Sequence, residues 1–170
     1  MKKNITEKGI IITGCIASSI TAELAGRHKD ELLARYPSYL VDKMLESADA
    51  DMKNERNIAE KYDCGIFGMD ESGFLETLWN MAEVYESGLM IDMKKVPIRQ
   101  ETVEVCEILD LDPYAMASKG CLMLVTDHAL QLASELKKSG AGAEIIGYLT
   151  KGKARILTYG ERTRYLDKPR

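Results

Sequence analysis

An adjacent pair of carboxylates, Asp70 and Glu71, is followed directly by Ser72 and Gly73. Paired acids could bind a metal ion or act as a general acid and base. Neighbouring residues at the start of a helix usually point in different directions, and acids there favour the positive end of the helix dipole. We therefore favour helix capping, in which Asp70 or Ser72 accepts hydrogen bonds from the free backbone N–H groups of the first turn.

A second candidate is the glycine-containing turn at Thr13 and Gly14, which stands before Ser18, Ser19 and a helical stretch. Free N–H groups at such a helix start could hold a phosphate. The segment reads TGCIASS, which matches neither the phosphate-binding loop nor the dinucleotide-binding fingerprint. An ordinary strand-to-helix turn is therefore the favoured interpretation. The candidate ligand-binding residues of the chain are Thr13, Gly14, Asp70, Ser72 and Gly73.

The histidines and cysteines indicate no catalytic centre. His28 lies in a charged run and His128 lies beside Asp127 at a helix start, without an obvious nucleophile or carboxylate partner. The four cysteines, at positions 15, 64, 106 and 121, show no CxxC spacing and no clustering with histidine. We therefore expect reduced, mostly buried thiols. We predict no metal site and assign no catalytic residue.

The composition limits the class of protein. The 170 residues are 45% hydrophobic, which is enough for the core of one domain spanning residues 1–170. The net charge is −4, so Lys and Arg are not in excess for phosphates and no nucleic-acid partner is expected. The apolar run after the basic start is too short for a signal peptide or a membrane span. We expect a cytoplasmic protein with no membrane partner.

Strand and helix patterns alternate through most of the chain, and antiparallel hairpins are expected to close it. The predicted fold class is α/β (α+β), a mixed β-sheet layered with α-helices, in which residues 9–13, 64–69 and 121–125 share one sheet. The other predicted strands are 89–93, 143–150, 153–159 and 164–166. The predicted helical segments are 18–50 with a break at Tyr36-Pro37, a solvated helix or loop at 49–62, a helix from Ser72 to Gly88, 98–110, a turn at Asp112-Pro113, and 127–140.

The helix after Ser72 has the clearest apolar face, which should pack on the sheet. Gly88 is expected to end this helix in the left-handed conformation. Asp127 is expected to cap the helix at 127–140. The residues expected to face inward are Phe74, Leu75, Leu78, Met81, Ala82 and Tyr85 in the helix after Ser72, Ile98, Val103, Cys106 and Leu109 in the helix at 98–110, and Leu130, Ala133 and Leu136 in the helix at 127–140.

Three segments of the sequence resemble a known family: DESGFLETLWNMAEVYESGLMIDMKKVPI from Asp70, ETVEVCEILDLDPYAMASKGCLMLV from Glu101, and AEIIGYLTKGK from Ala143. They are similar to the C-terminal domain of the aminoimidazole ribonucleotide (AIR) synthase superfamily. Its members include AIR synthase, selenophosphate synthase, thiamine-monophosphate kinase and the hydrogenase maturation protein that dehydrates a carbamoyl group. The resemblance covers nearly the whole chain and implies the fold of that domain. It is nearest to the hydrogenase maturation branch, although the Asp-x-Ser-Gly-Phe run also resembles selenophosphate synthase.

Departures from the family pattern bear on activity. Family members normally carry an N-terminal domain that supplies most of the ATP and magnesium site, and we expect no such domain within these 170 residues. The hydrogenase maturation protein has Asp-Pro-Thr-Arg-Gly-Gly where this chain has DESGFL, starting at Asp70. Its terminal cysteine, which carries the modified group, is replaced by DKPR. The resemblance therefore implies a stand-alone domain that is non-catalytic or dependent on a partner.

The resemblance and these departures leave three functional hypotheses. The first is a non-catalytic or partner-dependent protein. We expect the isolated chain to bind no cofactor, and ATP and magnesium to bind only if a partner completes the site. The second is one half of a split ATP-dependent enzyme, in which Asp70, Ser72 and Gly73 face a cleft shared with a separate nucleotide-binding-domain protein. The third is a sensor of small phosphorylated ligands. The expected partner is a second copy of the chain, forming a homo-oligomer, or that separate protein.

Overall fold

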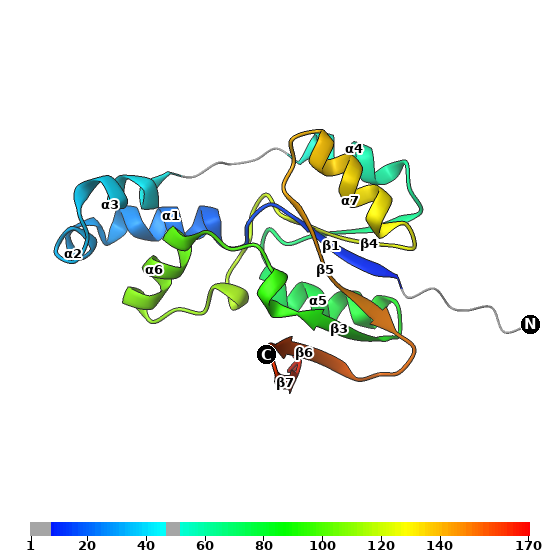
Figure 1. The fold of residues 1–170 in the computed structure, drawn as a ribbon. Helices are drawn as coiled ribbons and strands as arrows, with labels where there is room; N and C mark the ends of the chain where they lie inside the picture. Colours follow the sequence, from blue (N-terminus) through cyan, green and yellow to red (C-terminus); the bar gives the residue numbers. More distant parts are fainter. Residues whose placement is uncertain (1–7, 47–51) are drawn as a thin grey trace, which may run out of the picture.

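The computed structural model describes residues 8–46 and 52–170. The strands in these residues are β1 (Gly9–Thr13), β2 (Cys64–Gly68), β3 (Gly88–Asp92), β4 (Leu122–Thr126), β5 (Ala143–Thr150), β6 (Arg155–Tyr159) and β7 (Arg162–Tyr165). They form one mixed sheet in the order β2-β4-β1-β5-β3-β6-β7 (Figure 1). This confirms the predicted fold class, and it confirms that β1, β2 and β4 share one sheet.

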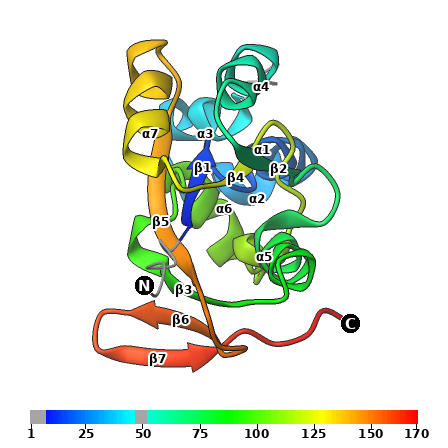
Figure 2. The same ribbon diagram turned by 90° about the vertical axis from the view of Figure 1, so that its right-hand side faces the viewer.

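The helices of the described residues are α1 (Ser18–Arg27), α2 (Lys29–Leu33), α3 (Ser38–Leu45), α4 (Lys53–Glu60), α5 (Gly73–Val84), α6 (Gln100–Leu109) and α7 (Ala129–Lys138), with single 3-10 turns η1 (Met93–Lys95) and η2 (Pro113–Ala115). Helices α4 and α7 lie on one side of the sheet and α5 lies on the other (Figure 2). Over residues 8–46 and 52–170, no helix combines the length and apolar content needed to cross a bilayer.

The run of three isoleucines in β1 explains why both faces of the sheet are covered. Ile10 and Ile12 belong to the core under α5, while Ile11 belongs to the core under α4 and α7. All three side chains are fully buried. Successive side chains of a strand point to opposite faces, so a strand between β4 and β5 must be apolar on both sides. The sequence GIIIT is therefore suited to the central position that β1 occupies.

Strand β2 is half-buried, whereas the sequence predicted a buried strand. It lies at the end of the strand order and pairs with β4, and its last residue, Gly68, is exposed. Met69, which follows the strand, is fully buried. An edge strand is in contact with solvent along one side, which accounts for its partial exposure.

The end of the chain differs from the expected succession of hairpins. Strand β3 lies between β5 and β6, antiparallel to β5 and parallel to β6, so the turn at 151–152 does not join paired strands. Only β6 and β7 form the expected antiparallel pair. A Cβ at Gly147 of β5 would overlap the main-chain oxygen of Met90 in β3, so glycine allows β3 to approach this closely.

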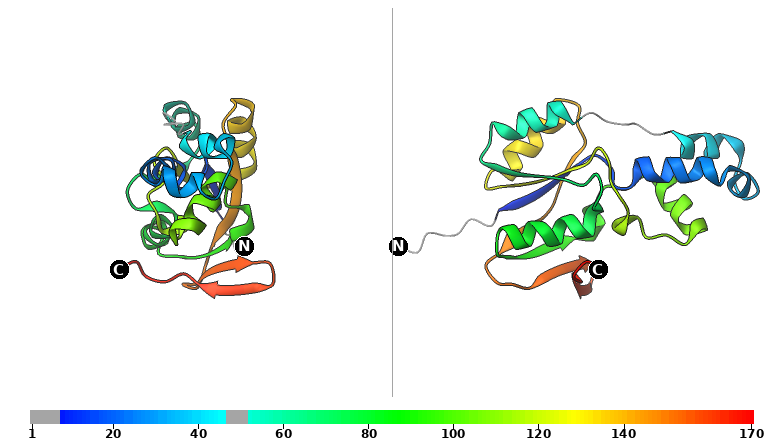
Figure 3. Two further views of the ribbon diagram at one scale, coloured as in Figure 1. Left: turned by 90° about the vertical axis from the view of Figure 1, so that its left-hand side faces the viewer. Right: turned by 180° about the vertical axis from the view of Figure 1, so that it is seen from behind.

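Helices α1, α2, α3 and α6 form a cluster beyond one end of the strands and are not layered on the sheet (Figure 3). The chain breaks at Tyr36-Pro37 as predicted, with Pro37 directly before α3, and also at His28 between α1 and α2. The predicted helical residues 47–50 lie outside the described residues. The buried core of the cluster is Ala25, Leu32, Val41, Met44 and Val105.

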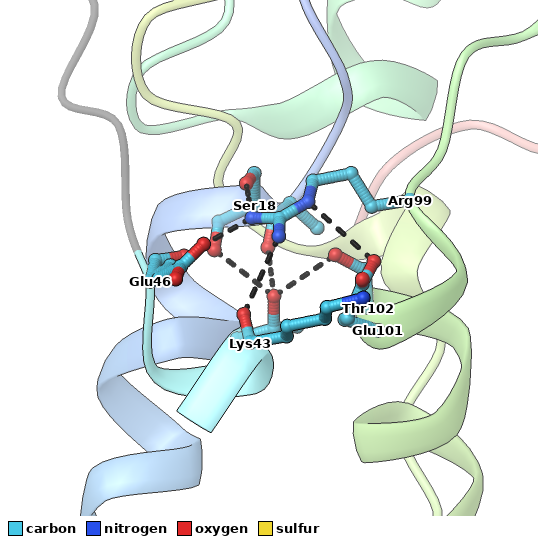
Figure 4. A network of polar contacts seen from close by, with 8 residues as sticks. Ser18, Lys43, Glu46, Arg99, Glu101 and Thr102 are labelled. Atoms are coloured by element: carbon cyan, nitrogen blue, oxygen red, sulfur yellow. Dashed lines mark hydrogen bonds and ion pairs between the residues drawn. The ribbon is translucent and has the colours of Figure 1, made fainter. Parts of the chain in front are cut away.

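Arg99 connects three helices of this cluster (Figure 4). Its guanidinium donates to Ser18 Oγ at 3.3 Å and to the main-chain oxygens of Lys43 at 3.3 Å and Glu46 at 3.0 Å. Its Nε lies 3.6 Å from the carboxylate of Glu101 in α6. Carbonyl groups in the last turn of a helix lack partners within the helix. Arg99 therefore satisfies the end of α3 and fixes it against the start of α1.

The apolar face predicted for α5 is confirmed. Phe74, Leu78, Met81 and Ala82 are buried in the core under the helix, and Leu75 and Tyr85 are half-buried and pack against it. The prediction for Gly88 is wrong, because the left-handed residue after the helix is Glu86, with φ of 49°. Gly88 instead begins β3, where a Cβ would overlap the main-chain oxygen of Ala154. The glycine is required because the turn before β6 approaches the start of β3 closely.

Two inward positions predicted for the later helices are wrong. Val103 and Leu130 are exposed, because each lies one step away from the face that its helix buries. Asp127 does not cap α7; the Thr126 hydroxyl accepts from the His128 N–H at 3.1 Å. The buried residues are Thr102, Val105 and Cys106 in α6, and Leu132, Ala133 and Leu136 in α7.

Candidate functional site

An open cavity of about 450 Å³ lies where α1, the end of α3, the residue after Met69 and the segment before β4 meet. Its walls come from parts of the chain that are far apart in sequence, and they include two carboxylates and one lysine. The lining residues are Ser19, Ile20, Ala22, Glu23, Leu45, Asp70, Ala117 and Lys119. A volume of this size is typical of small-molecule sites.

Asp70 is the one predicted ligand-binding residue among these lining residues. Its Oδ1 accepts a hydrogen bond from the main-chain N–H of Gly120 at 3.1 Å. The expected capping of α5 by Asp70 or Ser72 is wrong, because no side-chain cap is formed at the start of that helix. The Asp70 carboxylate instead accepts from the segment before β4, and this contact holds the exposed Asp70 on the cavity wall.

Ser72 and Gly73 hold the Asp70 loop and do not line the cavity. The Ser72 hydroxyl lies 3.2 Å from the Thr77 hydroxyl, which donates to the main-chain oxygen of Gly73 at 2.6 Å. Gly73 has φ of 75°, and a Cβ there would overlap the main-chain oxygen of Met116. Only glycine fits this conformation and this contact without strain.

Thr13 and Gly14 lie in the sheet and its first turn, apart from the residues that line the cavity. Thr13 is fully buried, and its hydroxyl accepts from the Leu122 N–H at 3.2 Å. Gly14 has φ of 78°, and its N–H donates to the oxygen of Gly142 at 3.2 Å. The structure therefore brings none of the other four predicted residues to the cavity beside Asp70.

Ser118 ties the walls of the cavity together and was not singled out from the sequence. It is fully buried; its N–H donates to the oxygen of Met69 at 2.9 Å, and its hydroxyl accepts from the Ala17 N–H at 3.0 Å. Ala17 is left-handed, with φ of 55°, and stands directly before α1. A single serine thus links the Asp70 loop, the segment before β4 and the start of α1. A lone serine in a loop gives no sequence signal of this role.

Burial disfavours the thiolate form of all four cysteines. Burial raises the pKa of Cys121 to about 12 and that of Cys106 to about 11. Burial also raises the pKa values of Cys15 and Cys64, which are only half-buried, contrary to the expectation of mostly buried thiols. All four are free cysteines.

The histidines also lie away from the cavity. His28 Nδ1 is 3.1 Å from the Glu31 carboxylate on the helical cluster, and His128 is exposed, with its ring 6.3 Å from that of Tyr62. Among the residues that the structure describes, no group of three His, Cys, Asp or Glu side chains could hold a metal ion. The polar contacts that the cavity offers come from serine, carboxylate and lysine side chains.

A family model described as the AIR synthase related protein, C-terminal domain, matches residues 70–160, more than half of the chain. This chain belongs to that family. The family match begins at Asp70 on the cavity wall and runs through β6. The resemblance seen in the sequence is therefore confirmed.

Two relatives of similar sequence are named for hydrogenase expression/formation and for carbamoyl dehydration. A protein of Methanocaldococcus jannaschii named for hydrogenase expression/formation is 35% identical, over 46% of this chain and 25% of the relative. The carbamoyl dehydratase HypE of Rhodobacter capsulatus is 32% identical, over 46% of this chain and 24% of the relative. The match thus spans about a quarter of each of these relatives.

Solved structures share the fold. HypE of E. coli, a hydrogenase maturation protein, has a TM-score of 0.78 at 19% identity, over 96% of this chain and 50% of that protein. A chain of a HypE-HypF complex has a TM-score of 0.79 at 20% identity, over 96% and 53%. Thiamine-monophosphate kinase from Stenotrophomonas maltophilia has a TM-score of 0.59 at 17% identity, over 89% and 50%. The AIR synthase C-terminal domain-like fold is confirmed, and the chain spans about half the length of these proteins.

Proposed function

We propose that this domain is a hydrogenase maturation-related protein that acts with a partner and does not catalyse a reaction on its own. The cavity beside Asp70 is the observation that supports this proposal. It is open, and its lining combines apolar side chains with the polar groups of Ser19, Glu23, Asp70 and Lys119. Such a surface can contribute contacts to a ligand, and in our proposal a partner completes the site.

The partner that we propose is a nucleotide-binding domain on a separate chain. The family resemblance supports this, since related proteins place their ATP and magnesium site largely on an N-terminal domain. ATP and magnesium would then be bound between the two chains, with Asp70 in the shared cleft and Ser72 and Gly73 holding its loop. The HypE-HypF complex adds that a protein of this fold assembles with a second protein. The proposal places the protein in the cytoplasm, in keeping with its free cysteines.

Turnover measurements test this proposal. The chain is purified alone and after coexpression with a nucleotide-binding domain of the family, and magnesium-dependent ATP hydrolysis is measured for both. We expect no turnover by the chain alone, and turnover by the complex that falls on Asp70→Ala. Hydrolysis by the chain alone, lost in the same variant, would contradict the proposal. A complex without turnover would restrict the function to a non-catalytic role.

A sensor of small phosphorylated ligands is the second candidate, and the cavity volume of about 450 Å³ favours it. A thermal-shift screen against nucleotides and phosphorylated metabolites is the test. A ligand at 100 times its dissociation constant should add about 2.7 kcal/mol of stability. Stabilisation by one of these ligands would support the sensor, and a flat screen would set it aside.

A further inference from the structure

The hairpin of β6 and β7 forms the edge of the sheet farthest from β2, on the opposite side of the domain from α4 and α7 (Figure 2). Within the described part of the chain, β7 pairs with β6 alone, and all four of its residues are exposed. Its sequence is RTRY, so its two arginines point to one face and Thr163 and Tyr165 to the other. This strand presents a basic edge to solvent.

Some main-chain N–H and C=O groups of β7 point away from β6, toward the open edge of the sheet. The Leu166 N–H donates to the oxygen of Arg155 at 2.8 Å, which fixes which pairs of this antiparallel ladder are hydrogen-bonded. Bonded and non-bonded pairs alternate along such a ladder. The N–H and C=O groups of Thr163 therefore point away from β6, as do those of Tyr165. An edge of this kind is a template for an added strand.

A cavity of about 380 Å³ lies beside this edge, on the face that carries the two arginines. Tyr114 of η2 contributes to it and is close enough to Tyr159 and Arg164 for their charges to act on its pKa, which burial raises. The cavity therefore combines an apolar interior with a cationic border. Its lining residues are Met93, Tyr114, Leu157, Thr158, Tyr159, Arg162, Thr163 and Arg164.

The charge of this region is opposite to that of the whole chain. Residues 151–170 contain seven Lys or Arg and two Asp or Glu, whereas the chain has a net charge of −4. A second copy docked edge to edge would bring two such basic segments together, and like charges on neighbouring strands are destabilising. An acidic strand would face the arginines with opposite charge, which favours association.

The geometry points to a docking site on the β7 edge for an extended acidic segment of a partner protein. The segment adds a strand beside β7 through the outward groups of Thr163 and Tyr165. Its carboxylates face Arg162 and Arg164, and an aromatic side chain reaches the cavity beside Tyr114. This site shares no lining residue with the cavity beside Asp70.

Fluorescence anisotropy with a defined peptide tests this site on the full chain. The probe is a short fluorescein-labelled peptide of alternating glutamate and threonine with one central phenylalanine, and a lysine-for-glutamate version is the control peptide. We expect saturable binding of the acidic peptide alone, weakened by added salt. The double variant Arg162→Glu/Arg164→Glu should weaken it about tenfold or more. The charge-matched control Lys137→Glu/Lys138→Glu, on exposed positions of α7, should not.

The variant Thr163→Pro tests strand addition separately from charge. It removes an outward N–H and keeps both arginines and the ladder to β6, so we expect it to weaken the acidic peptide as well. Circular dichroism checks that each variant is folded. No binding of the acidic peptide, equal binding of the lysine peptide, or binding unchanged in both β7 variants would overturn the site. A concentration-dependent dimer in sedimentation that Thr163→Pro abolishes would also overturn it, because a second copy would then occupy the edge.

Discussion

The carboxylate of Asp70 accepts a hydrogen bond from the main-chain N–H of Gly120 at 3.1 Å, although the two residues are fifty positions apart. Gly120 is left-handed, with φ of 80°. The contact joins the loop after β2 to the segment before β4, and both contribute walls to the cavity. The same carboxylate is thus a loop constraint and the candidate ligand contact.

Asp70→Ala should lower the free energy of unfolding by about 0.5–1.5 kcal/mol, the usual contribution of one hydrogen bond. Asp70→Asn should lose less, because its amide oxygen can still accept from Gly120. Urea denaturation followed by circular dichroism measures both. Glu71→Ala, at the exposed neighbouring carboxylate, is the control and should stay within about 0.5 kcal/mol of the wild type. Equal effects at the two positions would show that the Gly120 contact contributes nothing.

Gly73→Ala should destabilise the protein strongly, by about 2 kcal/mol or more. The new Cβ meets the Met116 main chain, and the backbone has φ of 75°. Gly140→Ala is the matched control, since Gly140 has φ of 90° but nothing within 4 Å of its added Cβ. It carries the backbone penalty alone, about 1–2 kcal/mol. Urea denaturation should therefore give Gly73→Ala a clearly lower free energy of unfolding than Gly140→Ala. The reverse order would refute the contact with Met116.

Ser118→Ala should cost about 1–3 kcal/mol, because it leaves the buried Ala17 N–H without its acceptor. Thermal and urea unfolding measure the loss. Ser139→Ala is the control, at an exposed serine whose hydroxyl donates to the Leu136 oxygen at the end of α7. A loss at Ser118 no greater than at Ser139 would argue against its linking role.

Stability should decline at alkaline pH through Cys121. Its pKa is about 12 in the folded protein against 9.0 for an ordinary thiol, because burial disfavours the thiolate. The folded state holds this proton more tightly, so the stabilisation is complete below pH 9 and is lost as the pH rises toward 12. The slope from one such group is at most about 1.4 kcal/mol per pH unit. Cys121→Ala should flatten the decline of unfolding free energy above pH 9, and an unchanged slope would contradict this origin.

The spacing of apolar residues along the sequence correctly predicted the elements that are buried because of that spacing. The isoleucines of β1 and the apolar stripe of α5 each require burial, and both were placed correctly. The insertion of β3 between β5 and β6 depends on contacts between distant strands, which no periodicity records. The exposed faces of Val103 and Leu130 show that one step of helical phase is enough to misplace a residue.

The candidate site was only partly predictable for the same reason. Asp70 carries a group with evident chemistry, and it lies on the cavity wall. Ser118 and Arg99 determine how the walls meet, yet their roles depend on partners about 50 to 100 positions away. Thr13 was selected with Gly14 as a turn before a helix, whereas the structure buries its hydroxyl, which accepts from the Leu122 N–H. Residue type identified the candidates, and only the tertiary arrangement separates those that face the cavity.

Calorimetric titration of the purified chain with ATP and magnesium tests the central claim most directly. The account predicts no saturable, magnesium-dependent binding by this chain alone, and binding once a nucleotide-binding domain is supplied. Stoichiometric binding of the magnesium nucleotide to the isolated chain, abolished in Asp70→Ala, would contradict it.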